Sequence, residues 1–582
     1  MVENHQPAPF HPLSPSIQYI VRFPEPRTHY VSVEARIALP VQNEAEVFMA
    51  VWTPGSYLIR EYARHVEGVV VTDEAGNPLS FRKSRKNRWL IQTDAVAEIR
   101  FSYRVYCHEM SVRTNWVEES FALLNGAPTF VSLVGGSNLA HHVKLELPED
   151  WKVSITGAKG GVDYDTLVDS PILAGNPAIY PFEVAGVPHY LVNEGEAGVW
   201  DGLRSAADLQ KIVRYCALMW GSIPCDSYLF LNLLTESGGG LEHRNSVCMI
   251  ASRWATRTRP AYLKWLALAA HEYFHVWNVK RFRPAELGPF DYESENPTRS
   301  LWIAEGFTEY YTGLIVRRAG LSTATEYLET GLSELIAALQ STPGRLWHSA
   351  EEASWDAWIK LYRPDENTKN TSISYYTKGA VIGWLLDARI RRETGGAKSL
   401  DDLMRLAFER FSGEHGFTPR QFEATAEEIA GTSLRSFFAQ TVESTEELDY
   451  SEALDWFGLR LKATEERKCW LGTETKVETK AGAGRLLISR VARDGPAWDS
   501  ALAVDDEILA IDDFRVRPDQ LAQRLENYRP GDSVSILVAR RDLLMRIELT
   551  LARTPAKLHL EILQGASELQ NRQRDNWLAV RI

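Results

Sequence analysis

The chain has 582 residues, more than one hydrophobic core usually serves, so we expect three or four domains. Its 64 basic and 77 acidic residues give a net charge of −13. This balance argues against nucleic acid as a partner, because phosphate binding needs clustered Lys and Arg. The five cysteines are widely spaced without a CxxC pair, so neither a disulfide framework nor a cysteine zinc site is predicted.

The start of the chain has no basic segment followed by an apolar stretch, and no run of about 18 uncharged apolar residues occurs in the sequence. We therefore expect no signal peptide and no membrane segment. Together with reduced cysteines, these features predict a cytoplasmic protein.

Residues from about 17 to 190 predict an N-terminal all-β domain of the sandwich or curved-sheet type. Short, partly alternating segments such as IQYIVRF, HYVSVEARIAL and IRFSYRVY are separated by turn signals such as EAGNP. The stretch VWTPGSYLIREYARHV, residues 51–66, interrupts this pattern with Pro54 and Gly55. Arg60 and Arg64 in this stretch are expected to form salt bridges within the domain, and a position facing the cleft is the alternative.

The region from about 195 to 450 predicts a mainly helical domain with a small sheet at its front. The strand pattern SYLFLNLLT ends in the glycine run 238–240. RPAYLKWLALAAHEYFHVWNVKRF then predicts one long helix, and SLWIAEGFTEYYTGLIVRRAG, which starts at residue 300, predicts a second. After about residue 455 strand patterns return and predict a separate module of roughly 100 residues. The tail after 556 is polar, partly helical in pattern and not assigned.

HEYFH, residues 271–275, carries the candidate chemistry. His271 and His275 lie four residues apart, so a helix places both on one face, where they can bind one cation. Glu272 projects beside them and can reach a water on that metal. Catalytic zinc typically keeps three protein ligands and one open position.

The third ligand is expected to be Glu305, in the second predicted helix. A helical carboxylate is held more rigidly than a loop carboxylate, which disfavours four acids of the intervening loop. Glu309, four residues further along the same face, is expected to hydrogen-bond the far nitrogen of a zinc-bound histidine. An ordinary surface carboxylate is the alternative for Glu309. The four disfavoured loop acids are Glu286, Asp291, Glu293 and Glu295.

HEYFHVWNVKR followed by IAEGFTEYY resembles the gluzincin metallopeptidases, and in particular the glycyl aminopeptidase family, whose members carry a C-terminal PDZ domain. VWTPGSYLIREYARHV is similar to that family's N-terminal signature. GGGLEHRNS, residues 238–246, is similar to the strand and glutamate with which related aminopeptidases hold substrate, and SYYTKG, residues 374–379, to a Tyr-x-Lys-Gly element. RVARDGPAWDSALAVDDEILAIDD looks like part of a PDZ domain. These motifs cover nearly the whole chain.

The resemblance implies a multidomain α+β protein. Its parts are an N-terminal β-sandwich-like domain (1–192), a thermolysin-like zinc peptidase domain (193–455), a PDZ-like module (456–560) and a C-terminal tail (561–582). The carboxylate loop of the PDZ-like module is best matched by CWLGTE, residues 469–474, which departs from the usual pattern. Three roles stay open for this module: binding a partner's C-terminus by strand addition, guiding peptides to the cleft, or packing against the catalytic domain.

Roles for single residues follow from the resemblance and from zinc chemistry. Glu272 is expected to take a proton from the attacking water and to give it to the leaving amine. Tyr376 is expected to stabilise the oxyanion, with adjacent Tyr375 as the fallback and a packed core tyrosine as the plain alternative. Glu242 is expected to pair with the free α-amino group of the substrate, beside the glycine-rich strand of Gly239 and Gly240. A structural ion pair with Arg244 is the alternative for Glu242.

The zinc motif and the resemblance together predict an aminopeptidase with one zinc ion per chain, and the resemblance implies a preference for peptides starting with Gly or Ala. One alternative is an endopeptidase with the same zinc chemistry. The other is a PDZ-based peptide-binding protein with a vestigial metal site. Peptides with a free N-terminus are the expected partners, neither nucleic acid nor a membrane is expected, and a homo-oligomer stays open.

Overall fold

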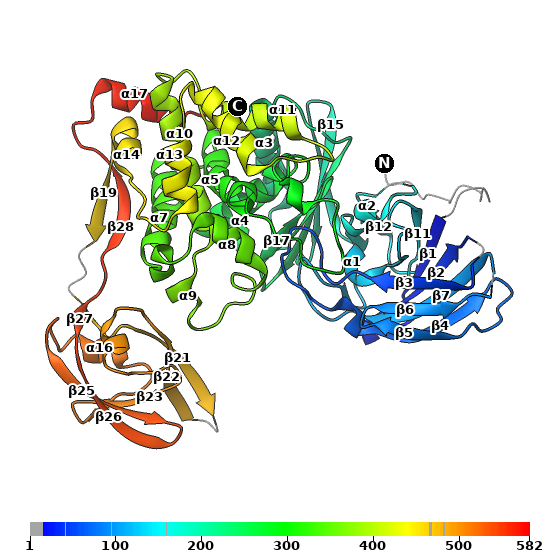
Figure 1. Cartoon of the computed structure of the whole chain (residues 1–582), viewed down its shortest axis with the longest axis horizontal. Coiled ribbons are helices and arrows are strands. Elements are labelled where there is room, and N and C mark those ends of the chain that lie inside the picture. The colour runs from blue at the N-terminus through cyan, green and yellow to red at the C-terminus, as the bar shows by residue number, and fades with distance from the viewer. Residues whose placement is uncertain (1–15, 41, 95, 159, 465–467, 481–482) are drawn as a thin grey trace.

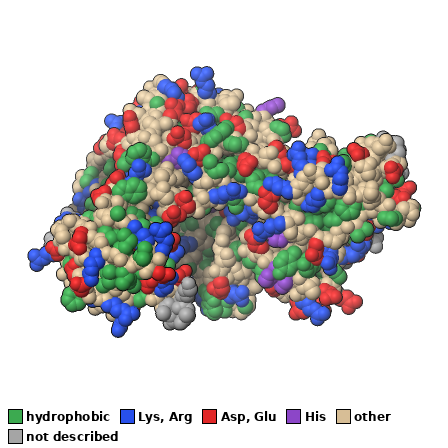
Figure 2. Space-filling model, turned by 60° about the horizontal axis from the view of Figure 1, so that its bottom comes forward, with side chains coloured by type: hydrophobic (Ala, Val, Ile, Leu, Met, Phe, Trp, Pro, Cys, Tyr) green, Lys and Arg blue, Asp and Glu red, His purple; other side chains and the backbone are tan. Residues whose placement is uncertain are grey.

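The computed structural model describes residues 16–40, 42–94, 96–158, 160–464, 468–480 and 483–582. Figure 1 shows an N-terminal β region, a central helical body and a C-terminal β region arranged along the long axis. Figure 2 shows the face on which the C-terminal and N-terminal regions flank a hollow. None of the described helices is long and apolar enough to cross a membrane. The multidomain α+β class predicted from the sequence is confirmed.

The N-terminal region contains three small sheets and one hydrophobic core. In strand β1 (Ser16–Arg22), buried side chains alternate with half-buried ones, as expected for a strand with one face on a core. One sheet has the order β11 (Ala140–Glu146), β1, β2 (Tyr30–Ala38), β7 (Glu98–Tyr106) and β4 (Val66–Asp73). A second has β10 (Val131–Leu133), β3 (Glu44–Met49), β6 (Arg88–Gln92) and β5 (Phe81–Arg85). A third has β12 (Val153–Thr156), β13 (Ile172–Gly175), β9 (Ala122–Leu124) and β8 (Trp116–Val117), and two short helices, α1 (Gly126–Thr129) and α2 (Tyr164–Val168), join these strands.

A mixed five-stranded sheet borders the helical body. Its order is β14 (Ala178–Val184), β15 (Val187–Glu194), β16 (Tyr228–Thr235), β18 (Ser246–Ser252) and β17 (Gly239–Glu242). Strand β17 pairs antiparallel with β18 and leaves its other side as the edge of the sheet. The predicted domain limit between residues 192 and 193 falls inside β15 of this sheet, and the domain limits remain predictions.

The described part of the helical body is built around four central helices and one large hydrophobic core. These are α3 (Gly202–Trp220), α4 (Arg259–Phe274), α5 (Thr308–Arg318) and α10 (Tyr375–Glu393). Shorter or peripheral helices complete it: α6 (Ala324–Tyr327), α7 (Ser333–Gln340), α8 (Ala350–Trp355), α9 (Thr368–Thr371), α11 (Leu400–Phe411), α12 (Pro419–Ala430), α13 (Arg435–Phe438) and α14 (Ser451–Phe457).

Two predicted helices differ in detail from the structure. The first was expected to run on past residue 280, but α4 ends at Phe274, and His275 is its C-terminal cap. The chain turns there, and the backbone carbonyl of Asn278 contacts the ring of His275. The second helix begins with a π-helical turn over Trp302–Phe307, which continues into α5. Wider turns of this kind are frequent at functional sites, and this one contains Glu305.

The unassigned tail returns to the helical body. Strand β28 (Lys557–Ile562) pairs antiparallel with β19 (Leu459–Thr464) beside α7, and α17 (Glu568–Trp577) follows it. Trp577 is fully buried, and its Nε1 donates a hydrogen bond to the Tyr310 hydroxyl at 3.0 Å. The backbone oxygen of Trp577 accepts from the buried Arg318 at 2.9 Å. The tail is therefore part of the helical body.

The C-terminal β region has its own core. It docks on the helical body through Asn370, whose side chain donates to the Val491 carbonyl at 2.8 Å and accepts from the Arg493 backbone at 2.9 Å. The PDZ-like assignment of this region remains a prediction. Its elements are β20 (Cys469–Trp470), β21 (Thr473–Lys480), β22 (Ala483–Val491), α15 (Pro496–Asp499), β23 (Glu507–Ile511), β24 (Phe514–Arg515), α16 (Leu521–Leu525), β25 (Ser533–Arg540), β26 (Leu543–Thr550) and β27 (Ala552–Arg553).

Candidate metal centre and peptide cleft

Three predicted ligands converge between α4 and the π-helical turn. The ligand atoms of His271, His275 and Glu305 all lie within 4.8 Å of one another. Glu305 Oε2 is 3.2 Å from His275 Nε2 and 3.8 Å from His271 Nε2. Burial alone raises the pKa of Glu305, but the adjacent His275 and His271 outweigh burial and lower it below the usual range. The carboxylate is therefore held in its charged form, as a metal ligand must be.

The far side of each histidine ring is fixed by a hydrogen-bond acceptor. His275 Nδ1 lies 2.6 Å from the carbonyl oxygen of Asn278, which can only accept, so Nδ1 carries the proton. His271 Nδ1 lies 3.1 Å from the Glu309 carboxylate and 2.9 Å from the Thr312 hydroxyl. The lone pairs of both Nε2 atoms then point toward Glu305, the arrangement found around zinc-bound histidines.

Asn278 has a second task beside the histidine. Its side-chain amide donates to the carbonyl oxygens of Ile303 and Ala304, both at 3.1 Å. These carbonyls belong to the π-helical turn, so the segment after α4 holds the turn that presents Glu305. These contacts give Asn278 a structural role.

Glu272 lies against the edge strand β17. A methyl group on Gly240 would come within 2.0 Å of Glu272 Oε1, so only a glycine leaves this carboxylate its space. Its Oε2 is buried and has no hydrogen-bond partner among the described atoms. Burial raises the pKa of Glu272, the two histidines oppose this, and the nearby Glu242 and Glu305 add to it. Glu272 is therefore poised to accept a proton from a group that enters the site.

Tyr376 stands on the other side of the histidines. Its ring stacks on His271 with centroids 6.2 Å apart, and the Tyr375 ring stacks on Tyr376 at 4.9 Å. Burial and the charge of Glu305 raise the pKa of Tyr376 well above its usual range, so the phenol stays a hydrogen-bond donor at neutral pH. Tyr375 is fully buried in the core beneath it.

The Tyr-x-Lys-Gly element fits the structure through its glycine. A methyl group on Gly379 would lie 2.5 Å from the Trp302 carbonyl oxygen and 2.9 Å from the Cα of Gly306. Two glycines therefore let α10 contact the π-helical turn backbone to backbone. This close contact brings Tyr376, at the start of α10, toward the turn that carries Glu305.

Glu242 ends strand β17 close to the three ligands. One of its carboxylate oxygens lies within 4.8 Å of the ligand atoms of Glu272 and His275. The side chain is 4% exposed, and its Oε1 has no hydrogen-bond partner among the described atoms. The alternative ion pair with Arg244 is absent among the described residues. A buried carboxylate without a partner needs a cationic or hydrogen-bonding ligand.

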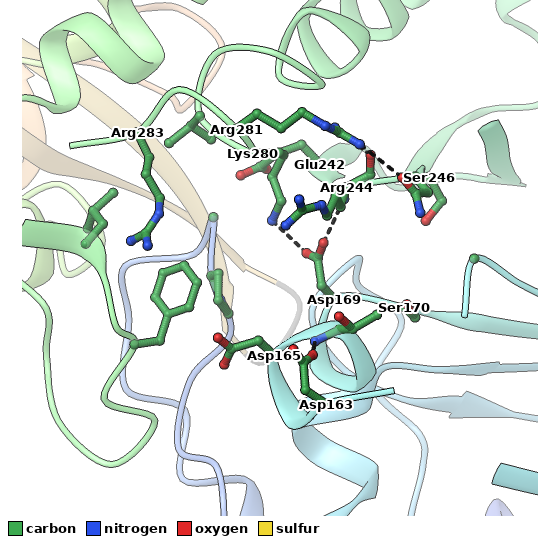
Figure 3. Close-up of a pocket in the computed structure, with 18 of the residues that line it drawn as sticks. Asp163, Asp165, Asp169, Ser170, Glu242, Arg244, Ser246, Lys280, Arg281 and Arg283 are labelled. Carbon is green, nitrogen blue, oxygen red and sulfur yellow. Dashed lines mark hydrogen bonds and ion pairs between the residues drawn. The ribbon is translucent and has the colours of Figure 1, made fainter. Parts of the chain in front are cut away.

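A pocket of about 290 Å³ opens beside Glu242, between α2 and the segment that follows α4 (Figure 3). One wall carries Asp169, which is half-buried and forms an ion pair with Lys280 at 2.6 Å. Gly55 of the N-terminal region closes one end, and a methyl group there would lie 2.4 Å from Glu242 Oε1. Because the φ angle of Gly55 is +87°, glycine is required on both counts.

The N-terminal region adds residues that the sequence analysis missed. The Tyr57 hydroxyl lies 3.4 Å from Glu305 Oε1, 248 residues apart in the chain. The Tyr362 hydroxyl donates to the Gly55 carbonyl oxygen at 3.5 Å. Arg113 Nη2 lies 3.5 Å from the Gly240 carbonyl oxygen. The unusual Pro-Gly stretch around Gly55 was the one sequence signal that pointed to this contact.

The disfavoured loop acids are engaged elsewhere or stand apart from the ligands. Glu293 pairs with Arg88 at 2.5 Å, and the Glu286 carboxylate accepts from the Thr298 hydroxyl. Asp291 accepts from the backbone of its own loop, and Glu295 is exposed. None of the four belongs to the metal-binding groups found among the described residues.

The donor set fits zinc. Two imidazole nitrogens and one carboxylate are a common set for catalytic zinc, which leaves a coordination position open for water or substrate. In both histidines the Nδ1 atom, which faces away from Glu305, is held by a hydrogen bond, as such a site requires. Their surroundings are rich in buried carboxylates, which favour a cation over an apolar or anionic ligand.

Two family matches agree with this site. The M61 glycyl aminopeptidase family matches residues 264–382, which include all three ligands. The Peptidase M61 N-terminal domain matches residues 18–176. No curated protein matches the chain.

A solved structure has the same fold over nearly the whole chain. An aminopeptidase N family protein from Idiomarina loihiensis is 28% identical, with a TM-score of 0.89, over 97% of this chain and 100% of that one. An M1 zinc metallopeptidase from Deinococcus radiodurans is 11% identical, with a TM-score of 0.48, over 75% of this chain and 95% of that one. With its two family matches and its His-His-Glu group, the chain belongs to the M61 glycyl aminopeptidase family and is a zinc metallopeptidase.

Proposed function

We propose that the protein is an aminopeptidase that removes small N-terminal residues, Gly or Ala, from peptides. The observation that carries this proposal is the buried, unpartnered carboxylate of Glu242 beside Glu272 and the metal ligands. A substrate ammonium group satisfies that carboxylate, whereas an internal peptide bond leaves it buried without a partner.

His271, His275 and Glu305 would hold one zinc ion per chain. When bound, zinc supplies a Lewis acid that polarises the scissile carbonyl and lowers the pKa of the attacking water. Glu272, whose pKa burial raises, accepts the proton of that water and delivers it to the leaving amine. The phenol of Tyr376 donates a hydrogen bond to the oxyanion. Glu309 keeps the ring of His271 in place.

The edge strand β17 positions the substrate backbone. Gly239 and Gly240 carry no side chains that block its outer side, and they lie beside the carboxylates that act on the first peptide bond. An extended peptide that pairs with this edge has its amino end at Glu242 and its first carbonyl near the metal ligands.

The cysteines and the C-terminal β region support two further parts of the proposal, the cellular compartment and the role of the PDZ-like module. All five cysteines are unpaired, and four of them are buried, which agrees with a reducing, cytoplasmic compartment. We propose that residues 456–560 form a PDZ-like module. Of its three open roles, packing on the helical body is supported by the contacts of Asn370.

The test compares hydrolysis of a short Ala-initiated peptide with that of its N-acetylated form. The wild-type protein is expected to cleave only the free peptide, and Glu272→Gln, with zinc bound, is expected to cleave neither. Glu242→Ala should lower kcat/KM for the free peptide by about a hundredfold, because a charged hydrogen-bonded pair is lost.

Equal cleavage of both peptides by the wild-type protein would mean an endopeptidase and would remove the assigned role of Glu242. If zinc binds, neither peptide is cleaved and Glu272→Gln leaves peptide binding unchanged, the result would favour a peptide-binding protein with a vestigial metal site.

A further inference from the structure

Two arginines of the N-terminal region, one beside Ser56 and one at strand β17, have no carboxylate partner among the described residues. Arg60 and Arg113 are half-buried, and the Nε of each is buried with no acceptor among the described atoms. No described carboxylate lies within ion-pair distance of either side chain. Arg64, in the same sequence stretch, behaves as expected and pairs with Glu109 at 3.5 Å. Half-buried, uncompensated charges are costly, so their presence suggests an anionic ligand.

Both arginines lie near the residues that act on the peptide bond. Arg113 reaches the outer side of β17 at the Gly240 carbonyl oxygen, 3.5 Å away. Arg60 Nη2 donates to the Ser56 hydroxyl at 2.8 Å, and the Tyr362 hydroxyl donates to the carbonyl oxygen of the adjacent Gly55 at 3.5 Å. Burial lowers the pKa of Arg60, to which Arg113 adds, while the charge of Tyr362 opposes it. The Tyr62 hydroxyl, two residues after Arg60, donates to the Arg113 carbonyl oxygen at 2.9 Å, so the segments that carry the two arginines are in contact.

The distance between Glu242 and Arg113 limits the length of a ligand that can contact both. A strand rises about 3.3 Å per residue, so Gly240 lies about 7 Å before Glu242 along β17. A peptide antiparallel to β17 that starts at Glu242 therefore reaches Arg113 with its second or third residue. The anion available at that point of a short peptide is its own C-terminal carboxylate.

We propose that Arg60 and Arg113 bind the C-terminal carboxylate of the substrate, so that the enzyme acts on dipeptides and tripeptides. This inference rests on the proposed aminopeptidase function. Glu242 binds the amino group of the substrate. The arginines bind its carboxylate through the charge-assisted, bidentate hydrogen bonds that guanidinium groups form with carboxylates. Longer peptides place a neutral amide where the arginines need an anion.

The experiment measures kcat and KM for one Ala-initiated tripeptide as the free acid, as the C-terminal amide and as the N-acetylated acid. The wild-type enzyme is expected to prefer the free acid over the amide by about tenfold to a hundredfold, mainly through KM, because a charged hydrogen bond is lost with the amide. Arg113→Ala and Arg60→Ala should lower the rate on the acid toward that on the amide and leave the amide nearly unchanged. Arg113→Lys should restore part of the preference.

Arg64→Ala is the matched control, because that arginine already has a carboxylate partner, and it should keep the full preference. Equal rates on acid and amide in the wild-type enzyme, or an equal loss on both in Arg113→Ala, would overturn the inference while the aminopeptidase assignment stands. Cleavage of the N-acetylated acid would instead overturn the proposed function. For a direct readout, zinc-loaded Glu272→Gln should bind the acid more tightly than the amide in calorimetry, and equal affinities would also contradict the inference.

Discussion

The carboxylate of Glu309 lies 3.1 Å from Nδ1 of His271, on the opposite side of the ring from the nitrogen that faces Glu305. The Thr312 hydroxyl lies 2.9 Å from the same nitrogen and donates a hydrogen bond to the Thr308 carbonyl oxygen. The helix that begins after the π-helical turn therefore orients a ligand on the neighbouring helix α4. Ligand and orienting residue come from different segments of the chain, so their packing is part of the metal site.

Glu309→Ala should weaken zinc binding by about tenfold to a hundredfold, because partners of this kind fix ring orientation and basicity. Competition with a chelator of known affinity measures the change. Glu334→Ala, at an exposed position of α7, serves as the control and should bind zinc like the wild-type protein. Unchanged zinc affinity in Glu309→Ala would show that His271 is oriented without it.

Gly240→Ala should lower kcat by roughly a hundredfold or more, since its methyl group would come within 2.0 Å of Glu272 and displace the base. The thermal midpoint should change little, because the carboxylate can swing aside. Gly238→Ala is the matched control in the same glycine run, where the nearest atom is 3.9 Å from the added methyl group. Equal activities of the two variants would argue against this position of Glu272 during catalysis.

Tyr376→Phe should lower kcat by about a hundredfold to a thousandfold with little change in KM, as loss of an oxyanion donor does. Tyr375→Phe should have a much smaller effect, since the Tyr375 hydroxyl is buried and has no partner among the described atoms. Steady-state kinetics of both variants on one free peptide decide between them. The reverse order of effects would transfer the role to Tyr375.

Asp169 should contribute stability that depends on pH. Burial raises its pKa, but the charge of Lys280 and the contact with His243 outweigh burial and lower the pKa to about 2. Because the unfolded value is about 3.9, this contribution is fully present above about pH 4 and is lost as the pH falls through about 2. The shift corresponds to about 2.5 kcal/mol. Asp169→Asn should therefore destabilise the protein at pH 7 and flatten the fall in stability below pH 4.

Denaturant titrations of wild type and Asp169→Asn at pH 7 and pH 3 test this expectation. The difference between the two proteins should be larger at pH 7 than at pH 3. A difference that does not depend on pH would assign the effect to packing rather than to the ion pair with Lys280.

The metal ligands were predictable because helical periodicity is local. His271, His275 and Glu309 follow from spacings of four residues, and Glu305 was preferred because it is helical. The contacts of Tyr57 with Glu305 and of Arg113 with Gly240 span 248 and 127 residues, and no local pattern encodes them. The early end of α4 and the wide turn at Glu305 were missed for the same reason, since both depend on contacts such as that of Asn278 with Ala304.

Arg60 was expected to pair within its own domain, as Arg64 does with Glu109. The structure leaves Arg60 without a carboxylate among the described residues, and its guanidinium donates to the Ser56 hydroxyl instead. Charge counting along the sequence treats the two arginines alike. The difference arises from their surroundings, because Arg60 is half-buried, whereas Arg64 is exposed and can reach Glu109.

The antiparallel pair of β19 and β28 brings the two ends of the C-terminal β region together, with Thr464 opposite Lys557. In topological terms that region is an insertion, and the helix that follows it supplies Trp577 to the core of the catalytic body. A stop codon after residue 455 would therefore remove a core residue together with the module. Excision with a short hairpin turn from Thr464 to Lys557 would keep the body whole, so the module's share in activity is best measured with that deletion.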